Sequence, residues 1–327
     1  MVVDCLYHTA MSFKKKQVVE AMKRLFVPMI FVIAFRNSLT WHLQRFWGAS
    51  GNVWESTYEN IAARFGEENI ALYGAAVSVF IVYCLNSIIF EFVDLTGKPA
   101  ILLKYKVQED QNVPVPTKKL LKCFSVVMYN LTIINVPIFL LLHPLMKARG
   151  CSAAPEDLPT FRRVFFESMV FILAEEIGFY YMHRMMHHPY LYKRIHKIHH
   201  EWTAPVAAMA VYAHPLEHVL ANMLPAILGP MIMGSHYATL CMWVAFALTV
   251  SQIQHSGYHL PFLPSPEAHD FHHLKFNYNF GAIGFLDRLH GTDSLFRKMK
   301  LHHRHLFLLS LMPASQQFPI EDKKILD

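Results

Sequence analysis

The sequence predicts an all-α protein, a polytopic membrane helical bundle with a cytosolic, histidine-rich di-metal cap. Hydrophobic residues make up 54% of the 327 residues and charged residues 17%, values outside the usual range of soluble domains. Several apolar stretches reach the roughly 20 residues that a helix needs to cross the hydrocarbon core of a bilayer. The cap is predicted by the clustering of histidines, because 14 of the 21 histidines lie between His183 and His273.

The apolar stretches predict several membrane spans. The clearest cover residues 71–94, 120–144 and 164–182. Two further segments, 215–233 and 237–254, are separated by three residues and predict a helical hairpin that either spans the membrane or re-enters from one side. Segment 25–47 holds an apolar run of 11 residues before Arg36 interrupts it. It therefore either crosses the membrane or lies in the interface.

The distribution of basic residues predicts the orientation of these spans. Residues 1–24 and residues 95–119 carry five Lys or Arg each, whereas residues 48–70 carry one. Short loops rich in Lys and Arg stay in the cytosol, so the alternation predicts that all four histidine clusters face the cytosol. Residues 145–163 run against this pattern, with four basic residues on the predicted lumenal side.

Composition also excludes several classes of protein. The net charge of +6 does not indicate nucleic-acid binding, because the Lys and Arg residues lie in loops where membrane topology accounts for them. The five cysteines are odd in number and form no CxxC pair. They therefore predict neither a disulfide framework nor a zinc ribbon.

Ten histidines fall into four short clusters with metal-ligand spacing. The clusters are His183 and His187; His196, His199 and His200; His255 and His259; and His269, His272 and His273. Residues three or four apart share one face of a helix. Each cluster can therefore aim its imidazoles at one metal ion or bridge a pair of ions.

The number of imidazoles predicts the kind of metal centre. Ten neutral rings suit two transition-metal ions with about five ligands each, since imidazole binds Fe, Zn, Cu and Ni whereas Mg and Ca prefer oxygen. A structural zinc site normally has four protein ligands and no open position. With about five imidazoles on each ion, an open coordination position would remain for oxygen or water, which favours a catalytic centre over a structural one.

Other polar residues near the clusters are candidates to orient the ligands. Second-layer groups of this kind usually accept an imidazole N–H, although each of these residues could equally be a helix cap or a surface charge. The candidates are His214, Glu217, His218, Asp270, His290 and Asp293. Glu175 and Glu176, near the end of a predicted span, could make capping contacts, face water or relay protons.

The order of the motifs, HxxxHH, HxxHH, HSGYH and HxxHH over roughly residues 160–295, resembles the fatty acid hydroxylase superfamily. The resemblance implies a pair of iron ions, an endoplasmic-reticulum membrane location, and electrons from NAD(P)H through cytochrome b5 or its reductase. Nine of the ten histidines match the family's ligand positions. The exception is His259, where the sterol oxidases of the family commonly have Asp or Asn.

These features together predict the domains and the function. Residues 1–119 form an N-terminal membrane region with one or two spans and a cytosolic loop, residues 120–300 the hydroxylase domain, and residues 301–327 a C-terminal tail. We expect a membrane di-iron oxygenase that hydroxylates a lipid, and the HPLE and HSGY segments favour a sterol, as in C-4 methylsterol oxidases. The alternatives are a zinc-dependent lipid hydrolase or lyase, and a non-catalytic transporter, scaffold or signalling protein. Zinc could also replace iron in purified protein.

Overall fold

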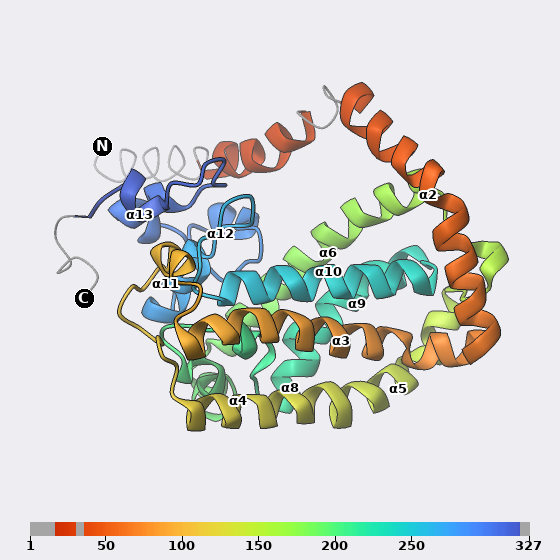
Figure 1. Cartoon of the computed structure of the whole chain (residues 1–327), viewed down its shortest axis with the longest axis horizontal. Helices are drawn as coiled ribbons and strands as arrows, with labels where there is room; N and C mark the ends of the chain where they lie inside the picture. The colour runs from red at the N-terminus through yellow and green to blue at the C-terminus, as the bar shows by residue number, and fades with distance from the viewer. Residues whose placement is uncertain (1–16, 31–35, 321–327) are drawn as a thin grey trace, which may run out of the picture.

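The computed structural model describes residues 17–30 and 36–320. Within these ranges the chain forms helices and no strand, apart from one isolated bridge between Lys106 and Tyr258. Helices α3 (Glu67–Thr96), α5 (Asn135–Ala148) and α10 (Tyr237–His255) run side by side, α2 (Arg36–Phe65) crosses one end of them, and α11 (Glu267–Lys275) and α12 (Phe285–His290) lie toward the other end (Figure 1). The prediction of an all-helical bundle is confirmed.

The helices of the bundle follow one another along most of the chain. They are α2 (Arg36–Phe65), α3 (Glu67–Thr96), α4 (Thr117–Tyr129), η2 (Asn130–Ile134), α5 (Asn135–Ala148), α6 (Phe161–Met186), α8 (Pro215–Glu217), η6 (His218–Met223), α9 (Leu224–Met233) and α10 (Tyr237–His255). Short elements build the cap: η1 (Ala100–Tyr105), α7 (Pro189–Arg194), η4 (His196–Glu201), η5 (Ala207–Val211), α11 (Glu267–Lys275), α12 (Phe285–His290), η7 (Phe296–Lys298), η8 (Lys300–Arg304) and α13 (Ala314–Gln317). One turn, η3 (Pro155–Asp157), precedes α6.

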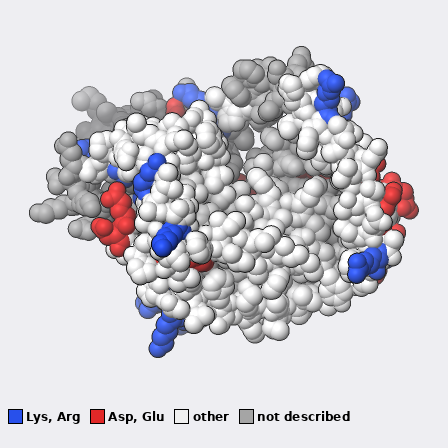
Figure 2. Space-filling model, viewed as in Figure 1, with Lys and Arg blue, Asp and Glu red and all other residues white. Residues whose placement is uncertain are grey.

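Four continuous helices in the described part of the chain are long and apolar enough to cross a membrane. They are Glu67–Thr96, Thr117–Ala148, Pro215–Met233 and Tyr237–His255, and they contain four of the predicted spans. Figure 2 shows a broad face without charged residues over the middle of the molecule, with Lys, Arg, Asp and Glu toward its margins. This distribution fits a multi-pass membrane protein, because charged side chains are costly inside the hydrocarbon core.

The predicted span 164–182 is a helix, but a more polar one than expected. It forms α6, which has 26 residues and is therefore about 39 Å long. Three buried or half-buried glutamates, Glu167, Glu175 and Glu176, fall within it, so α6 is not among the four apolar helices. It packs against α9 inside the bundle. The uncertain segment 25–47 includes residues 31–35, which lie outside the described residues.

Two glycines allow α6 and α9 to approach closely. A Cβ atom on Gly229 would lie 2.7 Å from the Cα atom of Phe171, and one on Gly178 would lie 3.1 Å from Pro225. Both contacts are tighter than van der Waals distance. Small residues at helix contacts are a common device for packing helices in membranes.

We expect Gly229→Ala to lower the melting temperature of the purified protein in detergent. The added methyl group would press on the backbone of Phe171, and overpacking of this kind costs about 1–3 kcal/mol. Gly48→Ala is the control, because a Cβ there meets nothing within 4 Å. Its melting temperature should stay level or rise slightly. Identical melting curves for the two variants would contradict the close contact between α6 and α9.

A buried loop after the second histidine cluster is fixed by the bundle helices. In the π-helical turn η2, the Asn130 Nδ2 atom donates hydrogen bonds to the carbonyl oxygens of Val211 (3.3 Å) and Ala213 (2.9 Å). On α3, the Tyr83 hydroxyl donates a hydrogen bond of 2.8 Å to the Ala208 carbonyl. The Glu91 carboxylate accepts a hydrogen bond of 2.8 Å from the Ala208 N–H. The bundle therefore sets the position of the loop that supports the histidines.

Candidate metal centre

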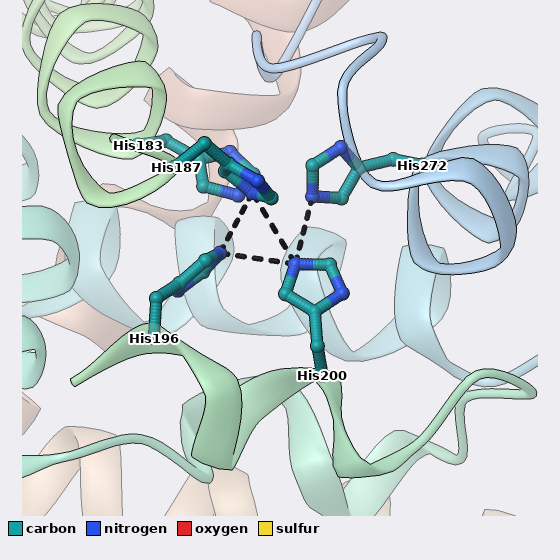
Figure 3. A group of neighbouring side chains, drawn as sticks. All are labelled: His183, His187, His196, His200 and His272. Carbon is teal, nitrogen blue, oxygen red and sulfur yellow. Dashed lines mark hydrogen bonds between the residues drawn. The ribbon is translucent and has the colours of Figure 1, made fainter. Parts of the chain in front are cut away.

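Nine of the ten predicted ligands meet in two groups. The first histidine group is His183, His187, His196, His200 and His272, and the second is His199, His255, His269 and His273. Within each group, one ring nitrogen of every member lies within 4.8 Å of those of the others. Figure 3 shows the first group, in which side chains from the end of α6, from η4 and from α11 point toward a common centre.

The separations of the ring nitrogens fit a shared ion. In the first group, Nε2···Nε2 distances are 2.8 Å for His187–His196, 3.0 Å for His196–His200, 3.3 Å for His187–His200 and 3.2 Å for His200–His272. In the second group they are 2.8 Å for His255–His269 and 3.2 Å for His269–His273. Metal–imidazole bonds of about 2.1 Å at right angles place neighbouring nitrogens about 3 Å apart. The observed distances agree with that spacing.

Five of the rings are held by hydrogen bonds that leave Nε2 free to bind a metal. Their Nδ1 atoms lie 2.6–3.2 Å from oxygen acceptors, four of them backbone carbonyls and one a carboxylate. A neutral ring that donates from Nδ1 carries a lone pair on Nε2. The pairs are His183–Phe280, His196–Glu217, His199–Tyr212, His255–Ser251 and His272–Tyr278.

A buried nitrogen without a partner supports metal binding further. The His183 Nε2 atom is buried and has no hydrogen-bond partner in the described part of the chain, while its Nδ1 atom is held by the Phe280 carbonyl. An unsatisfied buried polar atom costs about 1–3 kcal/mol. A cation at the centre of each group would satisfy the inward-facing lone pairs, so the residues present fit two transition-metal ions.

Burial keeps six of these imidazoles neutral. Burial, reinforced by the neighbouring rings, lowers the pKa values of six histidines below the ordinary value: His187, His199, His200, His269, His272 and His273. Neutral imidazole is the form that ligates metals. At neutral pH the rings therefore need to lose no proton before they bind an ion.

The two HxxHH clusters are each divided between the groups. His196 and His200 belong to the first group and His199 to the second, whereas His272 belongs to the first and His269 and His273 to the second. Adjacent residues lie about 100° apart around a helix, so neighbouring histidines point toward different groups. The His200 and His273 ring centroids are 4.8 Å apart. The sequence left open whether a cluster serves one ion or a pair, and in the structure each HxxHH cluster contributes histidines to both groups.

The tenth predicted ligand, His259, lies outside both groups. Helix α10 ends at His255, and Gly257 has a positive φ of 71°, so the chain turns before it reaches His259. The His259 Nε2 atom contacts the Leu306 carbonyl at 2.9 Å and its Nδ1 atom contacts Glu267 at 3.4 Å. Both ring nitrogens have protein partners, and we therefore leave His259 out of the ligand set.

Six residues were candidates to orient the histidine ligands. Of these, Glu217 contacts a histidine of the first group: its carboxylate accepts a hydrogen bond of 2.7 Å from His196 Nδ1. The other five have different partners. His214 accepts from the Leu216 N–H, His218 contacts Asn135, Asp270 contacts Gln108, His290 contacts Tyr181, and Asp293 pairs with Arg288 and Arg297.

The sequence did not reveal the loop that supplies two of the carbonyl acceptors. The Asp287 carboxylate accepts from the N–H groups of Phe280 and Gly281, both at 2.7 Å. The Glu176 carboxylate accepts from Ile283 and Leu286, which is a capping contact. These acidic side chains hold the Phe280 carbonyl where it accepts from His183.

An apolar cavity of about 420 Å³ adjoins the second histidine group. Its wall includes His255 and His269. Helices α6 and α10 form one side of the cavity, which carries aromatic and aliphatic side chains including Ile172, Phe179, Trp243, Phe246 and Val250. A cavity of this size and character suits an apolar molecule.

The fold and the site define a class: a multi-pass membrane protein with a two-group imidazole centre beside an apolar cavity. The family model for fatty acid hydroxylase matches residues 168–292, which contain all four clusters. Human fatty acid hydroxylase domain-containing protein 2 is 45% identical over 300 residues, covering 91% of this chain and 90% of that protein. The chain therefore belongs to the fatty acid hydroxylase family, as the motif order predicted.

More distant relatives carry names of different reactions. A methylsterol monooxygenase of Arabidopsis thaliana is 30% identical over 260 residues, 75% of this chain and 94% of that protein. A very-long-chain aldehyde decarbonylase of Oryza sativa subsp. japonica is 32% identical over 263 residues, 75% of this chain and 93% of that protein. No solved structure matches the chain. The family supports an oxygenase that acts on lipids.

Proposed function

We propose that the chain is a membrane di-iron oxygenase that hydroxylates a sterol, in the manner of a C-4 methylsterol oxidase. The observation that carries the proposal is the pair of adjacent histidine groups, in each of which one ring nitrogen of every member lies within 4.8 Å of those of the others. Two iron ions held there would activate O2 for insertion of oxygen into a C–H bond. The family's methylsterol monooxygenase and fatty acid hydroxylase members support this reaction class.

The chain's own residues prepare the site for this reaction. The carbonyls of Phe280, Tyr212 and Tyr278 fix the orientation of three rings, which would keep their inward nitrogens in place around bound ions. The cavity wall of α6 and α10 holds an apolar skeleton next to the second histidine group. The same wall excludes water from a reactive centre.

Several parts of the proposal concern the cellular context. The sequence has no flavin or haem motif of its own, so electrons would come from NAD(P)H through cytochrome b5 or its reductase. The basic loops support a cytosolic position for the histidine cap, and we place the protein in the endoplasmic-reticulum membrane. The HPLE and HSGY segments and the methylsterol monooxygenase relatives favour a sterol as the substrate.

Removal of the metal should abolish turnover. We expect protein stripped with a chelator to lose hydroxylation, and added Fe(II) to restore it where Zn(II) does not, because zinc has no redox chemistry. The measurement is mass spectrometry of the lipid product formed under ¹⁸O2 with NAD(P)H and the donor proteins. An ¹⁸O atom in the product is the expected result.

The same experiment separates the proposal from a zinc-dependent lipid hydrolase. A hydrolase needs neither O2 nor a reductant and draws its oxygen from water. Product formation without air and NAD(P)H, or unlabelled product from iron-loaded protein, would refute the oxygenase. Absence of any product from fully iron-loaded protein would favour the non-catalytic alternative.

A further inference from the structure

Two cavities meet along a shared wall between α6 and α10. The larger, of about 420 Å³, reaches His255 and His269, and the smaller, of about 100 Å³, extends between the helices of the bundle. Both are lined by Glu175, Phe179, Ala247 and Ser251. Glu175 therefore lies where the two cavities adjoin, on the wall of the one that reaches the histidines.

Glu175 differs from the other carboxylates that line the larger cavity. Glu176 accepts two backbone N–H groups, Asp287 accepts two more, and Asp293 pairs with two arginines. Glu175 makes no hydrogen bond or ion pair with any residue in the described part of the chain. Its side chain is therefore a polar group without a protein partner in an apolar wall.

The Glu175 side chain is half-buried and lines the cavities, so a ligand there can reach it. A ligand that displaces water from this carboxylate must supply a hydrogen bond in its place, because an unpaired polar group costs free energy once it is buried. Apolar binding sites use a small number of polar groups in this way to fix the orientation of a ligand. The neighbouring Ser251 hydroxyl, also without a hydrogen-bond partner in the described chain, is a second polar group on the same wall.

We propose that Glu175 binds a hydroxyl group of the substrate, and that the protein selects a lipid with one free hydroxyl on an apolar skeleton. The inference rests on the proposed function for its substrate but concerns binding alone. The hydroxyl donates its hydrogen to the Glu175 carboxylate, and the skeleton fills the cavity on either side. A sterol and a long-chain alcohol share this chemistry.

The test measures binding without turnover. Tritiated cholesterol and its 3-O-methyl ether, and a tritiated C18 alcohol and its methyl ether, are bound to the purified full-length protein in detergent, without O2 or reductant. We expect at least one alcohol to bind about tenfold more tightly than its ether, because the ether has no hydrogen to donate. The pair that shows this preference identifies the skeleton.

Variants of Glu175 then assign the preference to this side chain. Glu175→Leu should bind alcohol and ether equally, whereas Glu175→Gln should keep most of the preference, because its amide oxygen still accepts a hydrogen bond. Ile177→Ala is the control on the same helix, since Ile177 is 50% exposed and lines neither cavity. Melting temperature and metal content show that each variant is folded.

Three results would overturn the inference: no saturable binding of either pair, equal binding of alcohol and ether by the wild type, or a preference that survives in Glu175→Leu. A failure of the proposed function can be distinguished from a failure of this inference. Wild-type protein that prefers the alcohol but yields no ¹⁸O-labelled product would refute the oxygenase and leave the hydroxyl site standing.

Discussion

Replacement of His272 by alanine is expected to reduce lipid hydroxylation by at least about 100-fold and to lower the metal content of the purified protein. His272 is fully buried, and its Nε2 atom lies 3.2 Å from that of His200. Its Nδ1 atom donates to the Tyr278 carbonyl at 2.6 Å, which fixes the lone pair toward the first histidine group. Loss of residues that merely orient ligands costs 10–100-fold, and loss of a ligand should cost more.

The control for this variant is another histidine of the same region. His188 follows the ligand His187 in the chain but is exposed, and its Nδ1 atom accepts from the Tyr190 N–H at the start of α7. His188→Asn keeps a side chain that can cap the helix, so its metal content and turnover should match the wild type. Normal metal content and activity in His272→Ala would refute the assignment of the first group.

Replacement of Glu217 by leucine is expected to weaken metal binding by about 10–100-fold. The Glu217 carboxylate is 3% exposed and accepts from His196 Nδ1 at 2.7 Å. Without it, His196 is free to rotate or to change tautomer, and its Nε2 atom no longer faces His187 and His200 in a fixed position. Titration of metal-free protein with Fe(II) under anaerobic conditions measures the change.

A second glutamate near the same cluster provides the comparison. Glu201 ends η4 and contacts the Lys122 ammonium and the Tyr212 hydroxyl, both at 2.8 Å, rather than a histidine. Glu201→Leu should therefore bind Fe(II) nearly as tightly as the wild type. Equal losses in the two variants would mean that Glu217 acts through general stability and not through His196.

The grouping of nine of the predicted histidines was predictable because their spacing reflects the geometry of helices. Histidines four apart, such as His269 and His273 on α11, share a face wherever the local chain is helical. Apolar length predicted four of the spans for the same reason, since a helix must cover the hydrocarbon core. Local patterns of this kind can be recognised in the sequence without knowledge of the tertiary structure.

Features that depend on distant segments could not be predicted in the same way. The spacing of His259 matched a helix, but α10 ends at His255 and a left-handed Gly257 redirects the chain. The carbonyl of Phe280 lies 97 positions from His183. Because every residue has a backbone carbonyl, the sequence does not indicate which one accepts the hydrogen bond. The cavity beside Glu175 likewise exists because α6 and α10 are brought together by the fold.

Iron X-ray absorption on the purified full-length protein examines the proposal that histidine nitrogens hold a pair of iron ions. The proposal predicts a first coordination shell dominated by nitrogen, with the multiple-scattering pattern of imidazole rings, at about two iron ions per chain. The His272→Ala variant should show a weaker imidazole pattern. A shell dominated by sulfur or by oxygen, or protein that takes up no iron, would contradict the di-iron proposal.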